Sequence, residues 1–189
     1  MNVSPGIERE ERFRHVYNAN FEALLAYALR RVEQPPDAAD VVAETFLIAW
    51  RRADDMPSGD EIRLWLYGVA RRVLANHHRG GVRRARLGDL LRQRLTPPAA
   101  ADPSTEVPER LAVRAALARL GPIDREVLTL TAWEGLKPRE AATVLGVSPE
   151  TVRTRLSRAR AKMRDLLGHD RRAAGHVLDV LTVPSPEEA

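Results

Sequence analysis

Four prolines, Pro97, Pro98, Pro103 and Pro108, fall within twelve residues near the middle of this 189-residue chain. Because proline fixes its own backbone φ and lacks an amide donor, such a segment is typical of an extended linker and not of a packed core. Elsewhere, apolar residues recur at spacings of three and four, which is the period of an α-helix. The pattern predicts an all-α protein of two small helical domains joined by a Pro-rich linker.

Two helices are predicted at the N-terminal end. An apolar stripe runs through residues 11–32, and Pro35 and Pro36 are expected to end that helix. A second helix, residues 37–53, is expected to begin at Asp37, whose carboxylate can accept hydrogen bonds from the free amides of the first turn. Both helices are amphipathic, so they are expected to pack together.

A loop and a third helix follow. Residues 54–60 contain proline, glycine, serine and aspartate, each of which favours turns. The helical period then returns over residues 61–78, and Gly80 and Gly81 are expected to stop this helix. The first domain is therefore predicted to be a bundle of three helices.

Charge is unevenly distributed along the chain. The formal net charge is only +4, but residues 71–94 carry eight arginines against one aspartate, whereas residues 1–70 carry a net negative charge. Such a division indicates different partners for different segments. No cysteine is present, which excludes disulfides and thiolate metal sites. No apolar run is long enough to span a bilayer, so a cytoplasmic protein without membrane insertion is expected.

The second half of the chain contains four amphipathic segments between residues 108 and 168, and the last two predict a helix-turn-helix. Ala142 is small enough to let two helices cross closely, and Gly146 suits a left-handed turn. Ser148 is a good N-cap, and Pro149 is favoured at the first helical position.

The helix after this turn, residues 148–163, carries five positive charges and one negative charge yet keeps an apolar stripe. The stripe consists of Val152, Leu156, Ala159 and Met163. The side chains opposite the stripe are Thr154, Ser157 and Arg158. Cations flank the stripe on both sides: Arg153 and Arg160 on one, and Arg155 and Lys162 on the other. A helix in the major groove needs this arrangement, because central side chains reach base edges while flanking cations meet phosphates. A solvated helix is the alternative.

The order of these segments resembles the extracytoplasmic-function (ECF) group of the sigma-70 family of bacterial sigma factors. Residues 37–52 and 63–79 resemble region 2 of that family, and residues 117–167 resemble region 4. The resemblance implies four divisions of the chain: region 2 at 8–86, a linker at 87–108, region 4 at 109–168 and a C-terminal tail at 169–189. In the tail, residues 177–183 form a short, mostly apolar stretch.

The resemblance implies a protein that binds core RNA polymerase and directs initiation at promoters, without catalysis or cofactor of its own. Its implied partners are bacterial core RNA polymerase, promoter DNA and an anti-sigma factor. Region 4 would read the minus thirty-five element as duplex, through Arg153, Thr154, Arg155, Ser157 and Arg158. Region 2 would capture the melted minus-ten strand, through Met56, Arg71, Arg72, Asn76, Arg79, Arg83 and Arg84.

The acidic helix of region 2 would bind the polymerase clamp. The residues at the matching positions are Asp37, Asp40, Val41, Glu44, Phe46 and Trp50. From spacing alone, the three carboxylates share one helical face, which could bind a partner's arginines, ligate a metal or complement the helix dipole.

Two other classes of function remain open at this stage. One is a helix-turn-helix repressor that binds operators without polymerase. The other is a small nucleic-acid enzyme that uses Asp40 and Glu44 with magnesium, although no further carboxylate or histidine cluster is placed to complete such a site. Adjacent His77 and His78 point about 100° apart on a helix, so a shared zinc is not expected.

Overall fold

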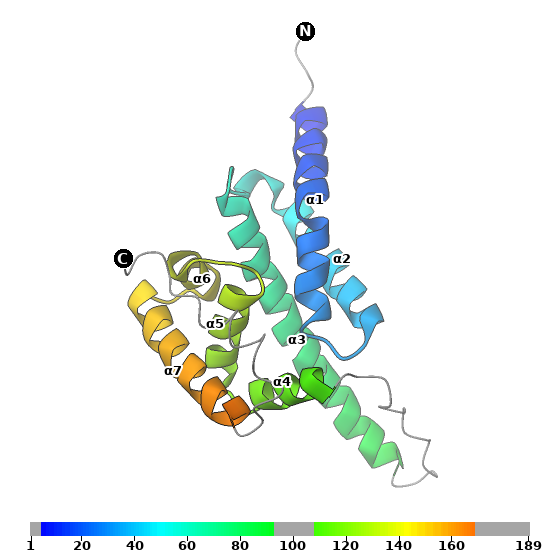
Figure 1. Ribbon diagram of the computed structural model, residues 1–189. Coiled ribbons are helices and arrows are strands. Elements are labelled where there is room, and N and C mark those ends of the chain that lie inside the picture. The colour runs from blue at the N-terminus through cyan, green and yellow to red at the C-terminus, as the bar shows by residue number, and fades with distance from the viewer. Residues whose placement is uncertain (1–4, 93–107, 169–189) are drawn as a thin grey trace. The chain divides into compact units, whose positions relative to one another are not determined.

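The computed structural model describes residues 5–92 and 108–168, with side chains for residues 6–80 and 111–168. In these ranges every regular element is a helix, which confirms the all-α prediction (Figure 1). The chain divides into two compact units, Met1–Ala99 and Ala100–Ala189. Most of the predicted linker and the whole predicted tail lie outside the described residues. No helix in the described ranges is long and apolar enough to cross a membrane.

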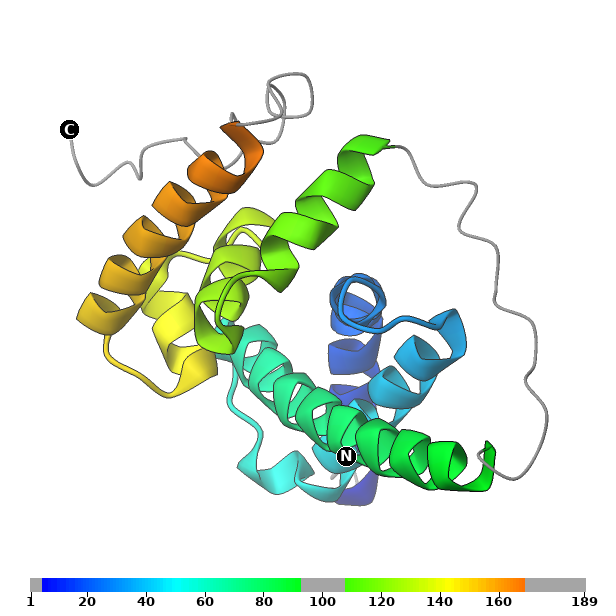
Figure 2. The same cartoon turned by 90° about the horizontal axis from the view of Figure 1, so that it is seen from below.

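The first unit contains α1 (Pro5–Leu29), α2 (Pro35–Arg51), the short 3-10 helix η1 (Ala53–Asp55) and α3 (Glu61–Arg92). The three long helices pack against one another in pairs, and Figure 2 shows α1 almost end-on beside the other two. Their shared core contains large apolar side chains from each helix: Leu24, Tyr27, Val41, Phe46, Leu66 and Val69.

The start of α2 differs from the prediction. The helix begins at Pro35, two residues before the expected cap at Asp37. Proline fits the first turn of a helix because its φ is already helical and its missing amide has no partner there. The two prolines therefore start the second helix, whereas the first helix has ended at Leu29. The Asp37 carboxylate lies instead 3.3 Å from His77 Nε2 of α3.

The end of α3 also differs from the prediction. The helix runs through Gly80 and Gly81 and continues to Arg92, so residues 87–92 of the predicted linker are helical. A glycine inside a helix costs about 1 kcal/mol relative to alanine, but it does not force a turn unless the chain needs a left-handed residue. The arginines and leucines on both sides of the glycines favour helix.

The second unit contains α4 (Pro108–Ala118), α5 (Pro122–Ala132), α6 (Pro138–Leu145) and α7 (Pro149–Gly168). Each of these four helices begins with proline, and together they occupy the range 108–168 in which four amphipathic segments were expected. Helix α7 packs against the other three and so forms the centre of the unit. Its core is built from buried side chains of all four helices: Leu117, Leu128, Leu130, Leu145, Val152 and Met163.

Candidate nucleic-acid interface

A tight turn joins α6 to α7 as a helix-turn-helix. Gly146 adopts a left-handed φ of 67°, and its backbone amide donates to the Ala142 carbonyl at 2.8 Å. Ala142 itself is buried, as expected for the residue at a close helix crossing. Ser148 Oγ accepts the backbone amide of Thr151 at 3.2 Å and so caps α7. The predicted turn chemistry is confirmed at each of these positions.

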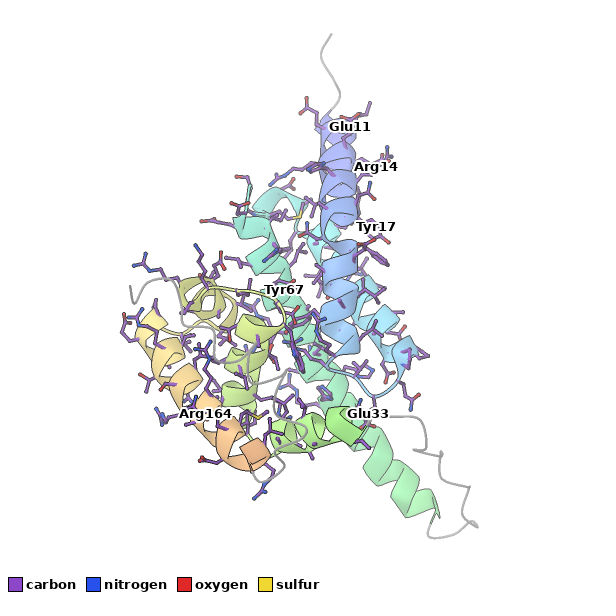
Figure 3. All side chains as sticks on the ribbon, viewed as in Figure 1. Glu11, Arg14, Tyr17, Glu33, Tyr67 and Arg164 are labelled. Atoms are coloured by element: carbon purple, nitrogen blue, oxygen red, sulfur yellow. The ribbon has the colours of Figure 1, made fainter. Side chains whose placement is uncertain are left out.

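Helix α7 turns its apolar side towards its own unit and its polar side outwards. The predicted stripe is buried in full: Val152, Leu156, Ala159 and Met163. The residues opposite it are exposed: Thr154, Ser157 and Arg158. Further along the helix, exposed Arg164 extends the charged surface (Figure 3). The outward face therefore has the polar centre and cationic edges that a major groove requires.

Two of the cations expected to meet DNA have carboxylate partners within the unit. Arg153 pairs with Glu150 at 2.9 Å, and Arg155 Nη1 lies 2.8 Å from Asp124 Oδ1 of α5. The pKa of the Glu150 carboxyl is lowered, first by a hydrogen bond with its own backbone amide and then by the Ser148 hydroxyl. Glu150 therefore keeps its negative charge beside Arg153 at neutral pH.

The other three arginines of the helix, Arg158, Arg160 and Arg164, differ in exposure. Arg158 is exposed and forms no hydrogen bond or ion pair with another described residue. Arg160 is half-buried, and its Nε atom has no partner among the described residues. Burial, followed by the charge of Arg164, lowers the pKa of Arg160. Because Arg158 also lies opposite the buried stripe, it is the arginine of α7 best placed to reach a base edge.

Helix α2 of the first unit presents an acidic and partly apolar outer face. Asp40 and Glu44 are exposed, and Leu47 and Trp50 are 41% and 38% exposed. Two other residues of α2 predicted to meet polymerase are not part of this outer face. Val41 and Phe46 are buried in the bundle, so they position α2 from inside and do not reach its outer surface.

The residues of α3 predicted to contact the minus-ten strand differ in exposure. Arg72 and Asn76 are exposed, and Arg71 is half-buried. The Asn76 side-chain oxygen accepts a hydrogen bond from the Arg79 guanidinium. Arg83 and Arg84 lie in the helical part of α3 whose side chains are outside the described residues.

Met56 lies in the connection between α2 and α3, and its side chain is only 5% exposed. It therefore packs into the bundle and does not face solvent, contrary to what direct base contact would require. Its backbone carbonyl accepts a hydrogen bond from Arg12 Nη2 of α1 at 2.6 Å. Arg12 and the neighbouring Arg9 were absent from the sequence-based candidates, because only their spacing of three residues on α1 hints at a shared task.

The described residues contain no group of three histidine, cysteine, aspartate or glutamate side chains able to hold a metal ion. The rings of His77 and His78 lie with their centroids 6.4 Å apart and their planes at 78°. His77 is directed to Asp37 instead, so the two imidazoles do not converge on one point.

The two units match two regions of one protein family. Residues 16–84 match Sigma-70 region 2, and residues 110–163 match Sigma-70, region 4. The chain is similar to RNA polymerase sigma factor CnrH of Cupriavidus metallidurans, with 37% identity over 161 residues, which covers 77% of this chain and 82% of CnrH. It is also similar to ECF RNA polymerase sigma factor SigL of Mycobacterium tuberculosis, with 30% identity over 152 residues, covering 80% and 86%.

The solved structure of CnrH in complex with the cytosolic domain of CnrY has the same architecture. Its TM-score is 0.61 at 31% sequence identity, and the match covers 85% of this chain and 90% of that one. A helical bundle followed by a helix-turn-helix unit, each matching its sigma region, defines a bacterial transcription-initiation factor. The chain belongs to the sigma-70 family, and within it to the ECF sigma factors. It therefore directs RNA polymerase to promoters.

Proposed function

We propose that the two units divide promoter recognition between them. Region 4, residues 109–168, reads the minus thirty-five element as duplex. Region 2, residues 8–86, binds the polymerase and captures the melted minus-ten strand, and residues 87–108 join the two. The observation that carries this proposal is the exposed polar face of α7, which stands opposite a fully buried apolar stripe.

At the minus thirty-five element, Arg158 is the direct reader. A guanidinium can donate two hydrogen bonds to the O6 and N7 atoms of guanine, the commonest specific contact in the major groove. Thr154 and Ser157 lie beside it and can donate to or accept from base edges. Arg153 and Arg155 face phosphates at the walls of the groove, which position the helix without reading sequence.

At the minus-ten element, Arg72 and Asn76 supply the polar contacts to the single strand from the exposed side of α3. The backbone of this strand is followed by further cations of the same helix: Arg71, Arg79, Arg83 and Arg84. Met56 contributes from the core by fixing the connection that precedes α3. Residues 54–60, in the connection before α3, correspond by the resemblance to region 2 to the loop that captures an unstacked base. Hydrogen bonds to the exposed edge of that base would hold it.

Polymerase binding belongs to the outer face of α2. Asp40, Glu44 and Trp50 are the exposed members of the set expected from the sequence, and carboxylates with a large aromatic ring suit a basic and apolar partner surface. Asp37 contributes through its contact with His77, which ties the first turn of α2 to α3.

The chain acts by binding and leaves catalysis to the polymerase, so it works in the cytoplasm, where that enzyme and the chromosome are located. An anti-sigma factor is a further partner. The complex of the relative CnrH with the cytosolic domain of CnrY supports a protein partner of this kind.

Reconstitution tests the proposal. Purified protein is added to sigma-free bacterial core polymerase with a library of genomic fragments, and the starts of the transcripts are mapped by sequencing. We expect a shared minus thirty-five and minus-ten pattern upstream of the starts. Tight duplex binding by the protein alone without transcripts would favour a repressor, and magnesium-dependent turnover without polymerase would favour an enzyme.

A further inference from the structure

Two arginines of α1 reach across the first unit to the connection between α2 and α3, residues 52–60. Arg12 Nη2 donates to the Met56 carbonyl at 2.6 Å and to the Pro57 carbonyl at 3.3 Å. Arg9 Nη2 donates to the Trp50 carbonyl at 2.8 Å, at the last turn of α2. These contacts join segments more than forty residues apart in the sequence.

The chemistry of these contacts favours tight positioning. Hydrogen bonds from a charged donor are shorter and stronger than neutral ones, and a guanidinium presents its donors in a rigid planar arrangement. The carbonyls at the end of α2 also carry the negative end of the helix dipole, which attracts a cation. This attraction acts on Arg9, which binds the Trp50 carbonyl. Arg12 binds the Met56 and Pro57 carbonyls and so fixes two successive peptide groups of the connection.

Aromatic stacking holds Arg9 in place. Its guanidinium lies over the Trp50 ring at 5.1 Å from the ring centre, and the Phe13 ring meets the same indole edge-on at 5.0 Å. The carboxylate of Asp54 in η1 lies 3.8 Å from Arg9. The N-terminal half of α1, which also carries Glu11 and Arg14 (Figure 3), thus forms a platform for the connection.

The connection has an anchored half and an exposed half. Ala53 and Met56 are buried, and the carbonyls of Met56 and Pro57 are the ones bound by Arg12. Residues 58–60 are exposed, and Gly59 among them has a left-handed φ of 61° with open space around it. The exposed half begins directly after the last carbonyl held by Arg12, so its position depends on that anchor.

We propose that Arg12, assisted by Arg9, is a positioning residue that fixes the exposed half of the connection and thereby sets which base of the melted strand it accepts. The inference rests on the proposed role of region 2 at the minus-ten element. Neither arginine touches DNA in this arrangement. Both act through the backbone carbonyls that they bind.

The test uses holoenzyme reconstituted from core polymerase and the full chain, on a promoter found by transcript mapping. Four templates differ in one minus-ten base and are mismatched there, so that this base is unpaired on every template before the polymerase melts the rest. We compare wild type, Arg12→Ala, Arg12→Lys and Arg14→Ala. Arg14 is a matched control, because it lies on the same helix but pairs with Glu10, four residues away, at 2.7 Å. Affinity for core polymerase is measured in parallel by competition.

We expect Arg12→Ala to reduce the preference for the favoured base about tenfold, as for the loss of one hydrogen bond to a charged group, with core binding unchanged. Arg12→Lys should restore part of the preference, because an ammonium donates to one carbonyl but lacks the planar pair of donors. Arg14→Ala should behave as wild type. Hydrogen exchange of the Met56 amide, which donates to the Ala53 carbonyl, should quicken in Arg12→Ala alone.

Two results would overturn the proposal while leaving the role of region 2 intact. One is an unchanged base preference in Arg12→Ala. The other is a parallel fall of core binding and preference that Arg12→Lys restores together, since Arg12 would then support the whole bundle. If wild-type holoenzyme has no preference among the four templates, the proposed function of region 2 fails, and the inference fails with it.

Discussion

Each unit contains an arginine that binds backbone carbonyls at the end of a helix, but the two arginines span very different lengths of chain. In region 4, Arg125 Nε donates to Leu117 at 2.8 Å, and its Nη2 donates to Ala118 at 2.9 Å and Leu120 at 3.3 Å. In region 2, Arg12 reaches a carbonyl 44 residues away. The first contact closes a local turn between α4 and α5, whereas the second places a distant connection.

Because of this difference, we expect Arg125 to contribute to the stability of its unit and Arg12 to contribute to DNA recognition. The turn held by Arg125 joins two helices that pack on α7, so its loss should be felt throughout the unit. The connection held by Arg12 ends in exposed residues, so its loss can be local. Arginines that bind the backbone can therefore serve the fold or the site, depending on what the bound segment carries.

The largest effect is expected for Arg125→Ala. Three carbonyls lose a charged donor, and we expect the free energy of unfolding of region 4 to fall by about 3 kcal/mol. Hydrogen exchange of α4 and α5 amides in the full chain measures it, because protection there reports the opening of this unit. Arg119→Ala is the matched control, since Arg119 lies in the same turn and is exposed. Equal effects of the two variants would refute the structural role of Arg125.

The next largest effect is expected for Arg158, which binds no backbone carbonyl of the described residues. Arg158→Ala should cost about 1 to 3 kcal/mol of discrimination between the correct minus thirty-five duplex and one with a changed guanine, and should leave stability unchanged. Titration of both duplexes with holoenzyme measures the ratio. Arg164→Ala is the control and should weaken both duplexes equally, because its position on α7 suits phosphate contact. An equal loss on both duplexes for Arg158→Ala would remove its role as a reader.

Two of the three described glycines with a left-handed φ, Gly59 in region 2 and Gly146 in region 4, allow a further comparison. A Cβ at Gly146 or Gly59 would meet no atom within 4 Å, so substitution tests backbone strain alone. Gly146→Ala should cost about 1 kcal/mol, because the turn is fixed between two packed helices and cannot relax. Gly59→Ala should cost less, because the residues around Gly59 are exposed, whereas Gly146 lies between two packed helices. Urea denaturation of the full chain compares the two, and a greater cost for Gly59→Ala would show that the connection is the more rigid segment.

Whether a feature could be predicted from the sequence depends on whether its contacts are local or distant in the chain. Residues close in sequence specify the helix-turn-helix, since Gly146 and Ser148 act on atoms a few positions away, and both were predicted correctly. Asp37 failed as a cap because a competing local signal, Pro35, starts the helix earlier. The expected stop at Gly80 failed because glycine weakens a helix without ending it.

Contacts that depend on the folded chain had no such local signal. Arg12 and Met56 meet only after α1 and α2 have packed, so neither the anchor nor the burial of Met56 could be read from spacing. The same holds for Arg155, whose charge suggested a free phosphate contact although its partner Asp124 lies 31 residues earlier in the chain. The sequence thus identified the recognition helix, but not how many of its cations are free.

The smallest expected effect tests whether that pairing limits DNA binding. About a third of each side chain in the Arg155–Asp124 pair is exposed to solvent. The pair itself should therefore contribute less than about 1 kcal/mol to the free energy of unfolding. Asp124→Asn removes the competing carboxylate. If Arg155 is thereby released to a phosphate, the slope of log affinity against log salt concentration should steepen by about 0.9. The holoenzyme is titrated with minus thirty-five duplex at several salt concentrations.

Arg155→Ala and the double variant complete the cycle and separate two readings of the pair. If Asp124 restrains Arg155, the gain in Asp124→Asn disappears when Arg155 is also replaced, because no cation remains to be released. If Asp124 acts only by repelling DNA through its own charge, the gain persists in the double variant. The second outcome would leave Arg155 as a brace between α5 and α7, the role that Arg125 has between α4 and α5, and would remove it from the residues that bind DNA.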